Sequence, residues 1–347
     1  MKINLKSFLS ISLFTVFFAS VMLLTSCNGK DEPKDFTPVE GNYLKESTKL
    51  AVNIEDYNTI PNNPIPALSV PTYITKIDGY YFIVDCYNNQ VIYNDNLDVP
   101  VYEWFIMTTD IDKGHTVASD GKVYLIDDTE NNRILVMEKT KNLNNMDVFV
   151  PTQEFTEIGT RPHYIIYDER TASFYAWSSM TGEMYIFQRD SASTDVYLTK
   201  IMSIPELNGF YVRSFTIMDE SILFVSGNSN IIECDKNTFE IKNRYPVPPE
   251  IAGMVQVVKI DDYYYITVST DLYGSQDNAT MIRTKSLNDL ISYKYEDVYD
   301  NFIGGGTPYC ITEIDEKYYL CEHRLPGHSI WSFDVKDNEI ANVTAIY

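Results

Sequence analysis

The chain has 347 residues and an acidic composition, with 27 Lys and Arg against 49 Asp and Glu and a formal net charge of −22. This charge disfavours nucleic acids and anionic lipid headgroups as partners, because both would be repelled. Apolar residues make up 44% of the chain, and the 27 Tyr and 17 Phe favour strands over helices. We therefore expect an all-β protein with a large core.

The beginning of the chain has the pattern of an export signal. Lys2 and Lys6 precede an apolar run over residues 8–24, and small and hydroxylated residues follow it. A transmembrane helix is the alternative, but it needs about 20 apolar residues and this run is slightly short. We expect residues 1–26 to be a signal peptide.

A resemblance adds to this expectation. The tetrapeptide LTSC, which ends at Cys27, resembles the lipobox of bacterial lipoproteins, and NGKDE at residues 28–32 resembles the acidic signal that directs Bacteroides-group lipoproteins to the cell surface. The resemblance implies lipidation of Cys27 and an outer membrane lipoprotein exposed at the cell surface, with a free secreted form as the alternative. Contact with the membrane would be made through the lipid.

The rest of the chain divides into a tether and a body. Residues 27–45 begin with a polar stretch that is poor in apolar residues, so we expect the lipidated cysteine and a flexible tether there. Residues 46–347 form the body. Within it, residues 114–137 spell out three antiparallel strands at 115–119, 122–126 and 133–137, and Asp120-Gly121 fits a two-residue hairpin turn with positive φ.

The same strand pattern recurs six times in the body, at intervals of about 40 to 50 residues, which leaves room for a fourth strand in each unit, such as 99–106 or 147–155. This predicts a six-bladed β-propeller with four antiparallel strands per blade. Residues 340–346 would supply the outer strand of the last blade, and residues 48–54 would be spare. Alternatively, residues 48–54 clasp the last blade.

The sequence LIDDTENNRILVM in the second unit and, more loosely, IVDCYNNQVIYND in the first are similar to NHL propeller repeats. The other four units keep the strand pattern and lose the Asn and Arg positions. The resemblance implies an NHL-like or TolB-like six-bladed propeller.

The repeat also predicts a candidate ligand site near the centre of the ring. In a propeller, the start of the innermost strand and the end of the second strand lie on one face. The first position is polar or aromatic in every unit, namely Tyr73, His115, His163, Arg213, Gln256 and Tyr309. The second is Asp85, Asp127, Ser178, Ser226, Ser269 and Glu322, and His323 follows the last. A water-filled channel with no ligand is the alternative interpretation.

These residues do not single out a reaction. His115 and His163 with a carboxylate could hold Zn²⁺, but no metal-binding motif is present and we expect neither a metal nor a cofactor. No G-x-S-x-G nucleophile elbow is present. We expect a binding protein for a small molecule, a glycan or an envelope protein. The alternative is an exported hydrolase or lyase, lactonase-like or glycan-acting, that uses His115 or His163 with a carboxylate or a metal.

Two further expectations concern cysteines and aromatic residues. If Asp315-Glu316 is a two-residue turn, Cys310 lies opposite Cys321, so a disulfide is possible after export, and two free buried thiols are the alternative. For stacking on sugar rings, the best candidates are the loop aromatics, which are Tyr87, Trp104 and Tyr273.

Overall fold

The computed structural model describes residues 35–57, 63–302, 306–323 and 327–347. Every described residue belongs to the second of the two units into which the chain divides, Pro33–Tyr347. The predicted signal peptide, Cys27 and the acidic sorting signal lie outside the described residues. Within the described ranges, no helix is long and apolar enough to cross a membrane.

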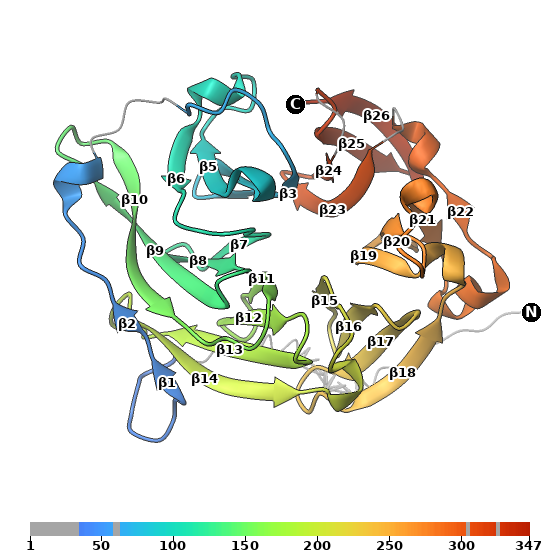
Figure 1. Cartoon of the computed structure of the whole chain (residues 1–347), viewed down its shortest axis with the longest axis horizontal. Coiled ribbons are helices and arrows are strands. Elements are labelled where there is room, and N and C mark those ends of the chain that lie inside the picture. The colour runs from blue at the N-terminus through green and yellow to red at the C-terminus, as the bar shows by residue number, and fades with distance from the viewer. Residues whose placement is uncertain (1–34, 58–62, 303–305, 324–326) are drawn as a thin grey trace, which may run out of the picture. The chain divides into compact units, whose positions relative to one another are not determined.

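The second unit is a six-bladed β-propeller, and each blade is built on four antiparallel strands (Figure 1). The first three blades run from the innermost to the outer strand as follows. Blade 1 contains β3 (Pro71–Ile77), β4 (Tyr80–Asp85), β5 (Gln90–Asn94) and β6 (Phe105–Thr108). Blade 2 contains β7 (Val117–Ser119), β8 (Val123–Asp128), β9 (Arg133–Lys141) and β10 (Asp147–Phe155). Blade 3 contains β11 (Pro162–Asp168), β12 (Ser173–Ser178), β13 (Glu183–Arg189) and β14 (Val196–Ser203).

The other three blades repeat this order. Blade 4 contains β15 (Phe215–Ile217), β16 (Ser221–Ser226), β17 (Asn230–Asp235) and β18 (Ile241–Pro246). Blade 5 contains β19 (Gly253–Ile260), β20 (Tyr263–Thr270), β21 (Thr280–Thr284) and β22 (Glu296–Asp297). Blade 6 contains β23 (Thr307–Ile314), β24 (Lys317–His323), β25 (Ile330–Lys336) and β26 (Glu339–Ala345). The predicted fold class and blade number are therefore confirmed.

Short 3₁₀ helices occupy several of the connections. They are η1 (Ile54–Tyr57), η2 (Cys86–Asn88), η3 (Val101–Glu103), η4 (Pro205–Leu207), η5 (Pro249–Ile251), η6 (Gln276–Asn278), η7 (Leu287–Ser292) and η8 (Tyr299–Asn301). None is long enough to add a helical layer, so the described part of the unit is all-β.

Blade 6 is complete without help from the beginning of the chain, because β26 pairs with β25 as its outer strand. The alternative, in which residues 48–54 clasp the last blade, is wrong. Instead, β1 (Lys45–Glu46) adds a fifth strand to blade 3, and β2 (Thr48–Lys49) adds a fifth strand to blade 2. Phe36 also forms a bridge with Asp190 of blade 3, so the expected tether of residues 27–45 includes residues that pair with a blade.

The ring is joined between blades 6 and 1 by side-chain contacts as well as by packing. The hydroxyl of Tyr347 accepts a hydrogen bond from Trp104 Nε1 at 3.0 Å. The same hydroxyl lies 2.6 Å from the carbonyl oxygen of Leu97 and 2.8 Å from that of Val99. These contacts satisfy polar groups that would otherwise be buried without a partner at the junction.

The turn at Asp120-Gly121 differs from its prediction. Ser119 pairs with Tyr124, so this pair encloses four residues instead of two, and Gly121 is the one among them with a positive φ, at 83°. Asp120 Oδ1 accepts hydrogen bonds within this loop, including one from Val123 N at 3.0 Å. The aspartate thus stabilises a longer loop that the dipeptide alone does not indicate.

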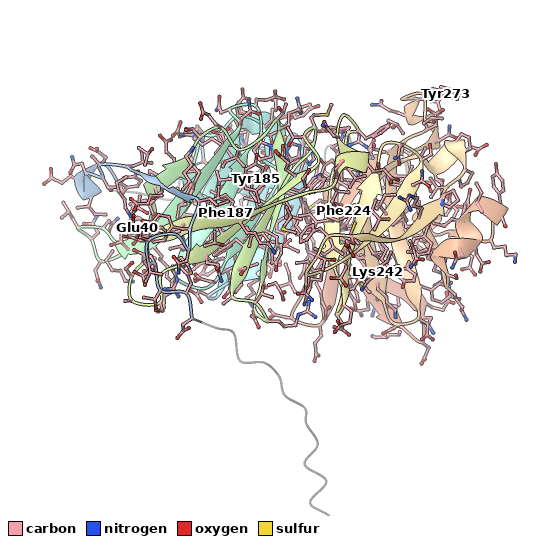
Figure 2. The ribbon with its side chains drawn as sticks, turned by 90° about the horizontal axis from the view of Figure 1, so that it is seen from below. Glu40, Tyr185, Phe187, Phe224, Lys242 and Tyr273 are labelled. Carbon is pink, nitrogen blue, oxygen red and sulfur yellow. The ribbon has the colours of Figure 1, made fainter. Side chains whose placement is uncertain are left out.

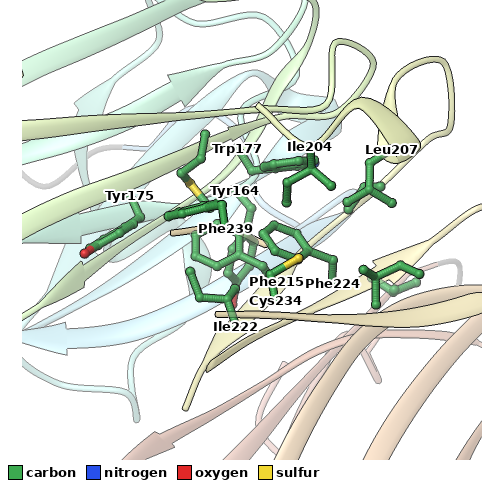
Figure 3. Packing of buried hydrophobic residues seen from close by; sticks show 14 of the residues in the cluster. Tyr164, Tyr175, Trp177, Ile204, Leu207, Phe215, Ile222, Phe224, Cys234 and Phe239 are labelled. Atoms are coloured by element: carbon green, nitrogen blue, oxygen red, sulfur yellow. The ribbon is translucent and has the colours of Figure 1, made fainter. Parts of the chain in front are cut away.

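The core consists of clusters between neighbouring blades. The cluster between blades 3 and 4 is rich in aromatic rings, and Figure 3 shows Trp177 close to Phe224 and Phe215. The ring centroids of Trp177 and Phe224 are 4.6 Å apart. Figure 2 shows Phe224 within the fold, whereas Tyr273 lies at the margin of the fold and is 85% exposed. Full burial of one such ring contributes roughly 2–3 kcal/mol, so blade-to-blade packing stabilises the ring strongly.

Candidate functional site

A cavity of about 280 Å³ opens where the innermost strands begin. Its lining includes His115, Arg213 and Tyr309 of the predicted ring, together with Ser269 and His323. It also includes side chains that the sequence analysis did not select, among them Lys113, Arg161, Tyr211, Cys86 and Glu130. The cavity is therefore polar, and three of its side chains are cationic.

Two stacked imidazoles and a phenol form the floor of this cavity. The rings of His115 and His163 lie 3.6 Å apart at 27°, and the ring of Tyr309 stacks 6.0 Å from His115. All three side chains are buried, with exposed fractions of 7%, 1% and 8%. His115 and Tyr309 face the cavity, whereas His163 lies beneath them.

The hydrogen bonds of His163 fix its tautomer. Nδ1 lies 2.9 Å from the carbonyl oxygen of Arg213, which can only accept, so Nδ1 carries the proton. Nε2 then accepts a hydrogen bond from the hydroxyl of Tyr309 at 3.4 Å. Burial, followed by the neighbouring His115, holds the pKa of His163 well below its usual range. His163 is therefore a neutral structural support for the cavity floor.

His115 is oriented by a second chain of hydrogen bonds. Thr129 Oγ1 donates to the carbonyl oxygen of Pro162 at 2.8 Å, so it accepts from His115 Nδ1 at 3.0 Å. This leaves His115 Nε2 as an acceptor, 3.8 Å from the sulfur of Cys86. Burial, together with the charge of Arg161, lowers the pKa of His115 to about 3. A neutral imidazole with an unprotonated Nε2 therefore borders the cavity.

The cationic side chains lie against aromatic rings. The guanidinium groups of Arg161 and Arg213 lie 5.6 and 5.2 Å from the ring centroid of Tyr211. Lys113 Nζ lies 4.5 Å from the centroid of Tyr87. Cation–π contacts of this kind contribute about 0.5–1 kcal/mol at exposed sites. Both tyrosines thus hold positive charge at the mouth of the cavity.

The structure divides the six residues of the first predicted set. Arg213, His115 and Tyr309 line the cavity and His163 lies under it, but Tyr73 and Gln256 do not belong to it. Those two line a separate hollow of about 380 Å³, bordered by later positions of the innermost strands. The six residues therefore do not form one ring.

A β-bulge explains this division. Tyr73 pairs with Val84, one residue before the end of its second strand, and the residue with the same pairing in blade 3 is Tyr164, which pairs with Trp177. The equivalent of Tyr73 is thus Tyr164 and not His163, and their rings lie 6.3 Å apart in an edge-to-face contact. Because each bulge inserts an unpaired residue, it moves neighbouring side chains to different levels of the channel.

The carboxylates of the second predicted set are buried under the cavity. Asp85, Asp127 and Glu322 are each 0% exposed. Asp127 accepts from the backbone N–H groups of His115 and Thr116 at 2.8 and 2.7 Å, and Asp85 accepts equivalent bonds from Ser69 and Val70 at 2.9 and 3.1 Å. Glu322 accepts from Trp331 Nε1 at 2.9 Å, and burial raises its pKa. Asp85 and Asp127 therefore tie the start of the innermost strand to the end of the second strand.

The metal alternative finds no support in the described part of the chain, where no group of three or more His, Cys, Asp or Glu side chains could hold an ion. Asp127 Oδ2 lies 3.7 Å from His115 Nδ1, and each already has a hydrogen-bond partner, Nδ1 in Thr129 and Oδ2 in the backbone N–H of His115. Two of the potential ligands are therefore already hydrogen-bonded within the fold.

The predicted opposition of Cys310 and Cys321 is wrong. Ile314 pairs with Lys317 as expected, but the register shifts between Pro308 and Ile311, so Cys310 falls within a bulge. Both cysteines are buried free thiols, which was the alternative interpretation.

The three loop aromatics have different environments. Tyr87 lines the cavity and is 61% exposed, and Tyr273 is exposed away from it. Trp104 is fully buried, because it packs at the junction of blades 1 and 6. It is not available to a sugar ring.

Three of the cavity residues that the sequence analysis missed share one simple signal. Lys113 precedes His115 by two residues, and Arg161 and Tyr211 stand in the same relation to His163 and Arg213. Lys113 and Arg161 each have a positive φ, at 57° and 59°, so the backbone turns just before these innermost strands. A search two positions before each predicted ring residue would have found them.

No protein-family model matches this sequence, and no curated protein matches it. Among solved structures, the chain is similar to a putative 6-phosphogluconolactonase from Bacteroides fragilis, with 12% identity, a TM-score of 0.54 and coverage of 80% of this chain and 83% of that one. It is also similar to a streptogramin B lyase, with 14% identity, a TM-score of 0.52 and coverage of 82% and 85%. A virginiamycin B lyase from Staphylococcus aureus gives 17% identity and a TM-score of 0.52, with coverage of 82% and 87%. At these identities, the comparisons show a shared propeller fold.

Proposed function

We propose that this protein is a lipid-anchored propeller of the cell envelope that binds a small-molecule ligand in the cavity where its innermost strands begin. The observation that carries the proposal is the cavity itself, which is polar, about 280 Å³ in volume and built on a rigid floor of His115, His163 and Tyr309. Sites with few, fixed polar groups in a concave surface are typical of ligand recognition. The proposal also includes binding of a partner protein, instead of a small molecule, at the same face.

The test uses the protein from Cys27 onward, incubated with a small-molecule extract of the cells that express it. After gel filtration and denaturation, mass spectrometry identifies retained compounds. Gln276→Trp, an exposed position on the cavity wall, should block the mouth and abolish retention, while Asp277→Trp, beside it but outside the cavity, should not. Equal retention by both variants would show that the ligand binds elsewhere.

The anchoring part of the proposal is tested separately, because Cys27 lies outside the described residues. Cys27→Ser should abolish incorporation of labelled palmitate and move the protein from the membrane fraction to the soluble fraction. Protease treatment of intact cells should remove the wild-type protein if it faces outward. Membrane association of the Cys27→Ser variant would contradict lipid anchoring.

A second candidate function is that of a hydrolase or lyase, and one observation favours it. His115 Nε2 is unprotonated and borders the cavity, which is the position of a general base, although its low pKa makes it a weak one. Cys86 is less suited to act as a nucleophile, because burial raises the pKa of its thiol to about 12 and keeps it protonated. Turnover of an ester, lactone or glycan by the wild type and not by His115→Gln would establish this function. The absence of turnover on all three would exclude it for those substrates.

A further inference from the structure

We propose that the ligand of this cavity is a small organic anion, with a carboxylate or phosphate group bound by Arg213 and Lys113. This inference rests on the proposed function, because it names the ligand class of the same cavity. It follows from how the positive charges in the cavity are compensated.

Arg213 differs from the other arginines in the described ranges. Six of them lie within 4.0 Å of a carboxylate oxygen: Arg133, Arg161, Arg170, Arg189, Arg244 and Arg283. Arg213 forms no such pair within those ranges, and its Nη1 contacts Ser269 Oγ at 2.7 Å and the carbonyl oxygen of Gly253 at 3.3 Å. In a protein with a net charge of −22, an arginine without a carboxylate partner is unexpected.

The charges that line the cavity do not balance. Lys113, Arg161 and Arg213 supply three positive charges, and Glu130 supplies the one carboxylate among the lining residues. Glu130 is already paired with Arg161, at 2.6 Å. Lys113 and Arg213 therefore remain at the cavity wall without an opposing carboxylate of the described chain. A bound anion would provide the missing charge in a partly desolvated space, where charge pairing is stronger than in bulk water.

The two guanidinium groups are also brought together by a shared aromatic ring. Arg161 and Arg213 both lie over Tyr211, so two positive charges are close to one ring. Arg161 is paired with Glu130, so a bound anion would oppose the charge of Arg213. The positive field reaches the floor, since both arginines contribute to the lowered pKa of His115. Because the imidazoles are neutral, the anion would pair with the cationic side chains and not with the histidines.

The size and shape of the cavity limit the ligand. A volume of about 280 Å³ is at or below the lower limit of about 300 Å³ for typical ligand pockets, so the ligand is small. The hydroxyls of Tyr309 and Ser269 donate to His163 Nε2 and to the carbonyl oxygen of Gly253, so they offer acceptor oxygens to hydroxyl groups of a ligand. Tyr87, which is 61% exposed, offers an aromatic face at the mouth. A compact hydroxylated acid or a phosphate ester fits this combination.

The test uses the imidazole resonances of the protein, recorded by ¹H–¹⁵N NMR at constant ionic strength. The probes are D-glucuronate, inorganic phosphate and D-glucose, which is the neutral counterpart of glucuronate. We expect glucuronate or phosphate to shift the His115 resonances saturably and glucose to leave them unchanged. Arg213→Gln should weaken anion binding tenfold or more, and Lys113→Gln provides a second variant at a half-exposed position.

Arg170→Gln is the matched control, because Arg170 pairs with Asp168 away from the cavity and should leave anion affinity unchanged. Shifts by glucose equal to those by glucuronate, or full anion affinity in both Arg213→Gln and Lys113→Gln, would overturn the anion inference and leave a neutral-ligand cavity in place. If none of the three probes shifts His115, the inference is also overturned. A neutral compound blocked by Gln276→Trp would then still support the proposed function.

Discussion

The two hollows along the innermost strands are both lined by polar side chains. They differ in whether the charged side chains have ion-pair partners. At the end bordered by Tyr164 and Gln256, polar groups pair with each other: Gln256 Nε2 donates to the hydroxyl of Tyr164 at 3.2 Å, and Arg170 pairs with Asp168 at 2.9 Å and with Asp219 at 3.0 Å. At the other end, Arg213 has no carboxylate partner in the described chain. The two ends therefore differ in charge balance, and this difference is the observation on which the proposed anion site rests.

The largest expected effect concerns the carboxylate that supports the cavity end. Asp127→Ala should lower the free energy of unfolding by about 3 kcal/mol or more, because it leaves several buried donors, including His115 N and Thr116 N, without an acceptor. Urea denaturation measures the change. Asp110→Ala, at a 74% exposed carboxylate, is the control and should change stability by less than about 1 kcal/mol. Equal effects would remove the structural role of Asp127.

The second effect is a pH dependence of the free energy of unfolding, which comes from His163 under the cavity. The pKa of His163 is lowered in the folded protein. Below about pH 6.5, the unfolded state therefore binds a proton at this residue that the folded state does not bind. The free energy of unfolding should therefore fall as the pH falls, by up to about 1.4 kcal/mol per pH unit for this residue.

His163→Gln should remove that part of the slope. The quantity to measure is the difference in the free energy of unfolding between the wild type and the variant, from pH 7 down to pH 4. The raised pKa of Asp127, about 7, contributes a slope of opposite sign in both proteins and cancels from the difference. Parallel stability curves would contradict a buried neutral His163.

A third test compares the two ends directly through their arginines. Arg170→Ala should lower the free energy of unfolding by about 0.5–1 kcal/mol, since it removes the ion pairs of a partly exposed side chain. Arg213→Ala should cost less in the ligand-free protein, because Arg213 forms no ion pair in the described chain and loses only hydrogen bonds such as that to Ser269. Thermal melts in ligand-free buffer compare the two. A larger loss from Arg213→Ala would mean that this arginine serves the fold and not a ligand.

The smallest effect is expected at the mouth of the cavity. Tyr87→Ala removes a 61% exposed ring that lies under Lys113, so the free energy of unfolding should change by less than about 0.5 kcal/mol. The same variant should weaken glucuronate binding a few-fold, because Lys113 loses its position. Unchanged affinity would limit the site to the deeper residues.

The architecture could be predicted because each blade carries the same local signal. Strand pairs around acidic turns recur six times, and Asp147–Phe155 is the outer strand of blade 2 over the range predicted. Alternation of apolar residues, together with turn chemistry, is local information, and a propeller repeats it. The partner of β1 and β2 could not be predicted, because two-residue strands carry no pattern that would identify the blade to which they add.

Only some of the residues that line the cavity could be predicted from the sequence, and the reason is physical. Alignment by sequence finds the beginning of each innermost strand to within about one residue, but one residue changes the side of the chain that faces the channel. His115 and Arg213 line the cavity, whereas Tyr73 and Gln256 line a separate hollow, because the sequence does not indicate where the bulges lie. Arg213 differs from the other described arginines in its lack of an ion pair, and this difference can be seen only from coordinates.

The two added strands at the beginning of the body have a mechanical consequence. Any tension applied at residue 35 would be borne first by the bridge of Phe36 with Asp190 and by β1 on β14, then by β2 on β10. Each of these attachments involves two residue pairs or fewer, whereas the blade strands beneath them pair over five or more. The segment would therefore detach under load before blade 2 or blade 3 opens.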